Sequence, residues 1–105
     1  MSRKKVIATP REAPAAPAVV LCLYVAEGAP NSLQAVANLA AICKGLPPRS
    51  FELEVVDVLT DPLRALADGI LVTPSLNKLS PSPPARLVGN LSDRGTVLRA
   101  LGLQT

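Results

Sequence analysis

The chain has 105 residues, of which 49% are hydrophobic, and this suits a single domain. It contains no histidine, so the commonest general base and the commonest metal ligand are both missing. The formal net charge of +3 lies entirely within residues 1–17, because the acidic and basic side chains of residues 18–105 balance. A neutral body with only two aromatic residues lacks the basic face and the stacking platforms that nucleic-acid binding needs.

Residues 1–17 are basic and rich in proline and alanine, and we predict that they form a disordered tail ahead of one domain, 18–105. The apolar run that follows, 19–26, is far shorter than the roughly eighteen residues needed to span a membrane. It also lacks the small-residue cleavage site of a signal peptide. We therefore expect a soluble, cytoplasmic protein that does not contact a membrane. A domain this small is of modest stability, and forming a dimer or tetramer would help it.

The segment 19–26 is apolar on both faces, which is typical of a central strand covered on both sides. Asn31 or Ser32 can then cap a helix that ends at Lys44-Gly45, a basic last turn followed by a glycine stop. The positions that recur at helical spacing, and are expected to face inward, are Leu33, Val36, Leu39 or Ala40, and Cys43.

From Phe51 the chain alternates between apolar and acidic residues, which predicts a strand near the sheet edge with Glu52 and Glu54 on a solvated face. Asp61-Pro62 is a helix-start signature, and this helix is expected to end near residue 68. Pro74 stands just before the next strand and is a candidate for a cis peptide bond.

The last third of the chain predicts a hairpin, formed by 76–79 and 85–89, and then a final helix. Ser92 with Asp93 begins that helix, whose inward positions are expected to be Val97, Leu98, Leu101 and Leu103. The order βαβαββα makes this an α/β chain on the thioredoxin-like plan.

The turn at 27–32 joins the first strand to the first helix, where a thioredoxin-type redox protein would carry its pair of cysteines. This turn contains none. Cys22 and Cys43 fall in different predicted elements, away from an exposed helix N-terminus, and are interpreted as reduced core residues. We therefore predict a binding protein that is not an enzyme, with no catalytic residue, no cofactor and no metal.

Four segments in register resemble the KaiB family of small clock proteins, and they span about residues 20–103. They are L-x-L-Y-V-A-x-x-x-P-N-S (21–32), V-x-D-V-L-x-x-P (55–62), I-L-x-T-P-x-L-x-K (70–78) and V-G-x-L-S-x-R (88–94). The homologous N-terminal domain of the SasA sensor kinases is the nearest rival. Because the sequence contains no kinase region, we expect a stand-alone KaiB-like protein.

The resemblance implies a regulatory protein that docks onto a KaiC-type ATPase ring, with a SasA-like kinase competing for the same site. It also implies that the chain can exchange between two folds: a thioredoxin-like monomer, which binds the ATPase, and a ground-state fold of order βαββααβ, usually a tetramer. Two packings of one sequence need a gap of only a few kcal/mol. The candidate switch positions bracket the segment that would refold: Pro74, Pro81, Pro83 and Pro84.

One departure from the family pattern bears on that exchange. Cyanobacterial relatives often carry glycine in the last helix where this chain has Ala100. Alanine in place of glycine favours a helix by up to about 1 kcal/mol. We therefore hypothesise that the thioredoxin-like state dominates in this protein.

Five residues are candidate partner contacts: Tyr24, Asn31, Ser32, Lys78 and Arg86. Tyr24 is the only tyrosine and has a polar end, which suits either ordinary packing or a contact. Asn31 and Ser32 most simply cap a helix, and the resemblance gives their turn interest as a contact surface. Lys78 and Arg86 flank the hairpin, where they serve either as surface charges or as contacts to an acidic partner.

Two further classes of function stay open at this point. The thioredoxin-like plan and the Thr73-Pro74 turn suit a redox or glutathione-handling enzyme, although the missing cysteine pair argues against one. A stress-response module unconnected to timing is the other. A gene for a KaiC-type ATPase beside this one would favour the clock function over the stress function.

Overall fold

The computed structural model describes residues 4–8, 19–46, 50–81 and 83–102, which form one sheet and three helices. The strands are β1 (Lys4–Ala8), β2 (Val19–Val25), β3 (Phe51–Asp57), β4 (Ser75–Ser80) and β5 (Ala85–Val88). The helices are α1 (Pro30–Lys44), α2 (Pro62–Ala67) and α3 (Arg94–Leu101). From β2 onward the order is βαβαββα, so the predicted plan is confirmed.

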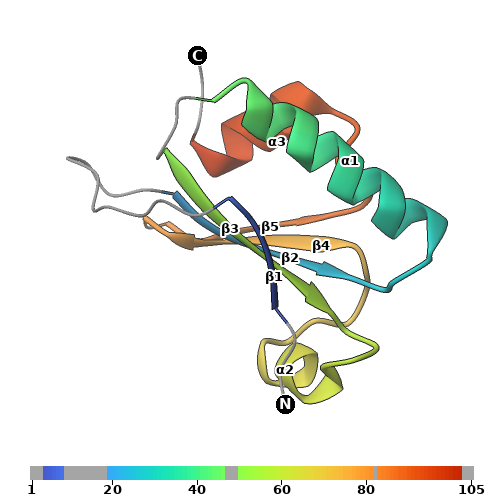
Figure 1. The fold of residues 1–105 in the computed structure, drawn as a ribbon. Helices are drawn as coiled ribbons and strands as arrows, with labels where there is room; N and C mark the ends of the chain where they lie inside the picture. Colours follow the sequence, from blue (N-terminus) through green and yellow to red (C-terminus); the bar gives the residue numbers. More distant parts are fainter. Residues whose placement is uncertain (1–3, 9–18, 47–49, 82, 103–105) are drawn as a thin grey trace.

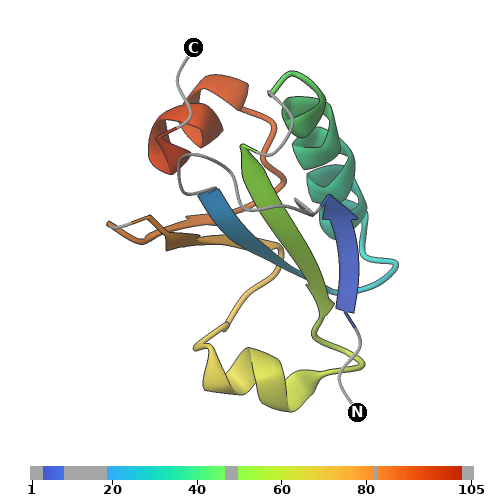
Figure 2. The same ribbon diagram turned by 60° about the vertical axis from the view of Figure 1, so that its left-hand side comes forward.

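The sheet has the strand order β1-β3-β2-β4-β5. Strands β2 and β3 run parallel, with α1 as the crossover between them, and β4 and β5 add an antiparallel hairpin on the other side of β2. Helices α1 and α3 cover one face of this sheet, and α2 lies against the opposite face (Figures 1 and 2). The molecule therefore has three layers, with the short helix α2 alone on its side among the described helices.

The main core lies between the sheet and the pair α1 and α3, because strand side chains alternate between the two faces. Leu21, Leu23 and Val25 of β2 point into this core, while the intervening Cys22 and Tyr24 point toward α2. All five side chains are buried, so the prediction of a central strand covered on both faces is confirmed.

Helix α1 begins earlier than the capping prediction placed it. Its first residue is Pro30, whose fixed φ and missing N–H suit the first helical position, and its N-cap is Ala29, without a side-chain cap. Asn31 and Ser32 therefore lie inside the first turn, and the prediction that either caps the helix was wrong.

The face of α1 that packs on the sheet also differs from the one that the apolar periodicity predicted. Leu33, which we expected in the core, is 59% exposed. The buried residues of α1 are Ser32, Ala35, Leu39, Ile42 and Cys43. The small side chains of Ser32 and Ala35 allow close packing on the sheet, which an apolar periodicity count does not register.

The N-terminal segment also differs from the prediction. Residues Lys4–Ala8, which we placed in a disordered tail, form β1 and pair antiparallel with β3. An unpaired edge on β3 would expose a row of backbone donors and acceptors, and β1 covers it. Strand β3 thus lies one strand in from the edge. The rest of the predicted tail lies outside the described residues.

The second half of the chain follows the sequence pattern closely. Pro62 is the first residue of α2, Asp61 is its N-cap position, and the Thr73–Pro74 peptide bond is cis, as predicted. Asp93 caps α3 by accepting a 3.1 Å hydrogen bond from the Thr96 N–H. Of the expected inward residues of α3, Val97 and Leu101 are buried and Leu98 is partly buried, whereas Leu103 lies outside the described residues. The expected exchange between this fold and a second fold of order βαββααβ stays a prediction.

Candidate functional site: the α2 face of the sheet

Helix α2 has six residues, and of these only Ala65 is buried. Beneath it lies a small apolar cluster made of Cys22, Tyr24 and Val56, with Val58 and Ile70 packed at its margin. This cluster is much smaller than the core on the other face. Apolar packing therefore supplies little of what holds α2 in place, and polar contacts supply the rest.

The phenol of Tyr24 makes the central polar contact. Its hydroxyl donates a 2.6 Å hydrogen bond to Oδ2 of Asp68, the residue that follows α2 as its C-cap. Burial and then the hydrogen bond to Asp68 raise the pKa of Tyr24 far above its ordinary value. The hydrogen bond from Tyr24, followed by that from Arg64, lowers the pKa of Asp68. At neutral pH the pair is therefore a neutral phenol donating to a carboxylate.

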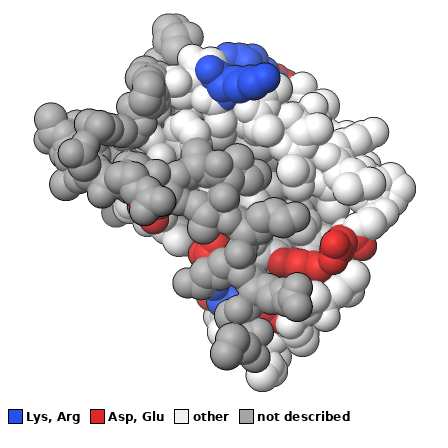
Figure 3. Space-filling view, in the orientation of Figure 1, with Lys and Arg blue, Asp and Glu red and all other residues white. Residues whose placement is uncertain are grey.

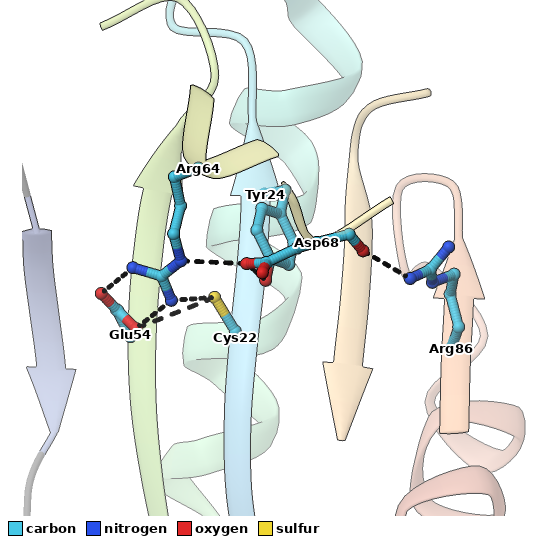
Figure 4. A network of polar contacts seen from close by, with 6 residues as sticks. All are labelled: Cys22, Tyr24, Glu54, Arg64, Asp68 and Arg86. Carbon is cyan, nitrogen blue, oxygen red and sulfur yellow. Dashed lines mark hydrogen bonds and ion pairs between the residues drawn. The ribbon is translucent and has the colours of Figure 1, made fainter. Parts of the chain in front are cut away.

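Arg64 joins α2 to β3. Its guanidinium pairs with both oxygens of Glu54, with Nη2–Oε1 at 2.9 Å and Nη1–Oε2 at 3.2 Å, and its Nε donates to Asp68 Oδ2 at 2.9 Å. These hydrogen bonds, to Glu54 first, raise the pKa of Arg64. Figure 4 shows the guanidinium lying between the two carboxylates, above the sheet. Glu54, which we expected on a solvated face, is thus ion-paired and its side chain is only 21% exposed.

Cys22 lies beneath this ion pair, because it stands directly beside Glu54 in the register of β2 and β3. Its Sγ is 3.9 Å from both Arg64 Nη2 and Glu54 Oε1 (Figure 4). Burial raises the pKa of the Cys22 thiol, and burial raises that of Cys43 to about 11. Both thiols are therefore protonated at neutral pH, a state that suits core residues and not nucleophiles.

Arg86 connects the other side of α2 to β5. Its Nη2 donates to the Asp68 carbonyl oxygen and its Nη1 to that of Gly69, each at 3.1 Å. Its Nε donates to Asn77 Oδ1 at 2.9 Å, which fixes the side chain along the sheet. The guanidinium therefore occupies carbonyls that the end of a helix leaves without intrahelical partners.

The structure brings two of the predicted contact residues together, because Tyr24 and Arg86 both bind Asp68. Lys78 does not join them. It pairs in register with Leu21, so its side chain starts on the α1 and α3 face, and the residue is only 6% exposed. An exposed role for Lys78 is therefore not supported by its position.

Helix α1 begins at the same end of the sheet as α2, where β2 and β3 finish (Figure 1), and Asn31 and Ser32 are the second and third residues of α1. Asn31 is exposed, whereas Ser32 is buried and its Oγ accepts a 3.0 Å hydrogen bond from the Ala26 N–H. Ser32 thus closes the turn after β2, and Asn31 is the member of the pair that a partner can reach.

The candidate switch prolines also differ in burial. Pro74 is buried at the start of β4, whereas Pro81, Pro83 and Pro84 are exposed in the hairpin loop.

Large apolar side chains are exposed all around α2. We call them the α2 apolar surface: Leu59 (65% exposed), Leu63 (78%), Leu66 (71%), Leu71 (89%) and Val72 (53%). They fall within fourteen consecutive residues, 59–72, that contain α2 and its flanking turns. A concentration of large exposed apolar side chains in one segment makes that segment a candidate protein interaction site.

Figure 3 shows one basic patch at the top of the molecule and the largest acidic patch at its lower right, with smaller acidic and basic areas side by side in the lower part. Much of the described surface on this face is uncharged. Among the described residues, no group of three or more His, Cys, Asp or Glu could hold a metal ion. No helix of the described chain is long and apolar enough to cross a membrane.

Comparison with known proteins decides the family. The KaiB domain family matches residues 22–103, which is most of the chain and includes every residue of the α2 face. The chain belongs to the KaiB family. This family is one of non-enzymatic clock proteins, so family membership argues against the redox alternative.

The curated KaiB relatives are similar over nearly the whole described domain. The circadian clock oscillator protein KaiB of Prochlorococcus marinus strain MIT 9313 is 45% identical over 84 residues, which are 80% of this chain and 71% of the relative. The protein of the same name from Trichodesmium erythraeum is 44% identical over 84 residues, 80% of this chain and 81% of the relative.

Two solved structures share the fold of this KaiB-family chain. The N-terminal domain of Synechococcus elongatus SasA is 26% identical with a TM-score of 0.60, over 92% of this chain and 95% of that domain. The thioredoxin-like fold is thus the one seen in the SasA domain. A structure described as a malarial protein has a TM-score of 0.65 at 15% identity, covering 80% of this chain and 98% of that one, which is a likeness of fold alone.

Proposed function

We propose that this protein is a regulatory binding protein that docks onto a KaiC-type ATPase ring in a circadian or timer-like pathway of the cytoplasm. Family membership supports the class of function, because its relatives are named circadian clock oscillator proteins. The observation that carries docking is the α2 apolar surface, five exposed aliphatic side chains within residues 59–72. Burying such side chains against a partner stabilises a complex by roughly 1.5–3 kcal/mol each.

The position of that surface suits a shared binding site. The turn after β2, which leads into the first turn of α1 and its exposed Asn31, is tied to the end of β3 and the turn that follows it by two contacts. The Val58 N–H donates to the Val25 carbonyl at 2.8 Å, and the Glu27 N–H donates to Asp57 Oδ1 at 3.3 Å. The two turns and α2 therefore form one continuous end of the domain. We propose that the ATPase contacts this end, with Asn31 at its margin.

A SasA-like kinase is the expected competitor. The SasA N-terminal domain shares this fold over 95% of its length, which supports competition for one site on the ring. Competition would make the two proteins mutually exclusive on one ring. Displacement of a bound SasA-like domain by this protein would support it.

Size-exclusion chromatography with light scattering tests the proposal. The purified protein is run alone, and then after long incubation with the KaiC-type ATPase of its own genome and nucleotide. Co-elution with the ring is expected, and the light scattering of the protein alone distinguishes a monomer from a dimer or tetramer. If no complex forms after a day, docking is refuted, and a stress-response role unconnected to timing becomes the better function.

A further inference from the structure

Helix α2 cannot owe its position to its own sequence. It has six residues, well below the length of about 12 at which an isolated helix begins to be stable in water. Its two leucines, Leu63 and Leu66, are 78% and 71% exposed, so they do not anchor it to the sheet. Contacts from outside the helix must therefore set where it lies.

The contacts come from three strands. Tyr24 of β2 and Arg86 of β5 both bind Asp68, the first at its carboxylate and the second at its carbonyl. Both therefore act at the C-terminal end of the helix. Arg64 is the only residue within α2 whose side chain reaches a strand through a described hydrogen bond, and it reaches Glu54 of β3. Figure 4 shows these residues as one chain of contacts from β3 across β2 to β5.

We infer that Arg64 is a positioning residue for partner binding. Through its two-pronged pair with Glu54 it fixes the orientation of α2 on the sheet, and so it sets the arrangement of the α2 apolar surface. This inference rests on the proposed function, since the surface it arranges is the proposed docking site. Arg64 itself needs no contact with the partner.

The geometry of the pair favours orientation over stability as its role. The two side chains are 26% and 21% exposed, and ion pairs that reach solvent add little to the free energy of unfolding. The main core lies on the opposite face of the sheet and does not include Arg64 or Glu54. A planar guanidinium with two parallel hydrogen bonds does, however, fix direction in a way that a lysine cannot.

The first test uses the free protein. Amide hydrogen exchange is measured for Arg64→Ala, Glu54→Ala and the double variant, with Arg99→Ala as the matched control. Arg99 is an exposed arginine of α3, and its Nη2 donates a 3.3 Å hydrogen bond to Thr96 Oγ1 within the same helix. The Ile70 N–H reports on α2, because it donates to the Ala65 carbonyl at 2.9 Å. Exchange at Leu39 reports on the main core.

We expect Arg64→Ala to speed exchange at Ile70 by about tenfold, and Glu54→Ala to have a similar or smaller effect because it leaves the Arg64–Asp68 hydrogen bond in place. The double variant should match Arg64→Ala, since Glu54 acts on α2 through Arg64. Exchange at Leu39 should not change in any variant, and Arg99→Ala should leave both sites as they are. Arg64→Lys should speed exchange at Ile70 as Arg64→Ala does, because a lysine cannot make the two parallel hydrogen bonds of the guanidinium to Glu54. Unchanged exchange at Ile70 in Arg64→Ala would overturn the positioning role.

The second test is the affinity of the same variants for the KaiC-type ATPase with nucleotide. Arg64→Ala should weaken binding, Glu54→Ala should weaken it by a similar or smaller factor, and Arg99→Ala should leave it unchanged. If exchange at Ile70 rises but affinity is unchanged, the link between α2 orientation and docking is wrong. Failure of the wild-type protein to bind would refute the proposed function instead, and the exchange data would still decide whether Arg64 positions α2.

Discussion

The hydroxyl of Tyr24 and the carboxylate of Asp68 are joined by a 2.6 Å hydrogen bond that spans 44 residues of sequence. The tyrosine belongs to the central strand β2, and the aspartate ends α2. A single contact thus connects the most buried strand to the segment with the most exposed apolar side chains. Because the chain has one tyrosine and no tryptophan, this contact can be followed by ultraviolet absorbance without mutation.

The first prediction concerns alkaline pH. An unfolded tyrosine ionises near pH 10, whereas burial and the hydrogen bond to Asp68 raise the pKa of Tyr24 in the folded state. The stability that Tyr24 contributes is therefore fully present below about pH 10 and is lost as pH rises above it. Tyrosinate absorbance should increase only together with loss of the circular dichroism signal.

Asp68→Ala provides the control for that titration. It removes one cause of the raised pKa and leaves burial, the larger cause, in place. Ionisation of Tyr24 should therefore shift to lower pH in this variant without reaching the value of a free tyrosine. Reversible ionisation near pH 10 in the intact wild-type fold would contradict the hydrogen bond.

The second prediction tests the inward face of α1. Leu39 is fully buried and Leu33 is 59% exposed, although both occupy positions that the apolar periodicity assigns inward. Leu39→Ala should lower the free energy of unfolding by about 2–5 kcal/mol, and Leu33→Ala by no more than about 0.5 kcal/mol. Urea titration followed by circular dichroism measures both. Equal losses would mean that the helix is rotated from the orientation described.

The third prediction concerns the two thiols. Cys22 and Cys43 are buried, and burial raises the pKa of both, to about 11 for Cys43. Because only the thiolate attacks, both should resist alkylation by iodoacetamide at pH 7.5 in the native state and react in urea. Mass spectrometry counts the adducts. Rapid labelling of a native thiol would show that its element opens, or that it is not packed as described.

The fourth prediction concerns the two folds. If the thioredoxin-like state dominates, backbone chemical shifts of Ala85–Val88 will be those of a strand, as in β5. Ala100 lies in α3, so Ala100→Gly should weaken that helix by about 1 kcal/mol and increase any minor state by roughly fivefold. Helical shifts at 85–89 in the wild-type protein would overturn the hypothesis.

The order of elements could be predicted because each carried a local signal. Both faces of β2 are apolar, Asp61-Pro62 begins α2, and Asp93 caps α3. The start of α1 was misplaced because two signals competed. Pro30 at the first helical position prevailed over Asn31 and Ser32 as caps, and Ser32 instead binds the Ala26 N–H.

The candidate site was harder to foresee, since its contacts join residues far apart in sequence. Arg64 and Asp68 are spaced as a helical ion pair, which was a usable signal within the predicted helix. Nothing local indicates that Arg64 also reaches Glu54, or that Asp68 accepts from Tyr24. Strand β1 was not predicted for a similar reason. It is held by pairing with β3, which is far away in the sequence, and nothing within its own five residues indicates that pairing.

The central claim is that the α2 apolar surface docks the protein onto a KaiC-type ATPase. It is tested most directly by the affinity of two matched serine variants for that ring in the presence of nucleotide. Leu71, 89% exposed, belongs to the α2 apolar surface, whereas Leu79, 52% exposed, lies near the end of β4 remote from α2. Since both are exposed, neither substitution should disturb the fold.

Leu71→Ser should weaken binding by about tenfold or more, the loss expected when one leucine no longer buries its side chain at the interface. Leu79→Ser should leave the dissociation constant within about a factor of two of the wild-type value, a change well under 1 kcal/mol. Equal affinity of the wild-type protein and Leu71→Ser for the ring would contradict the claim.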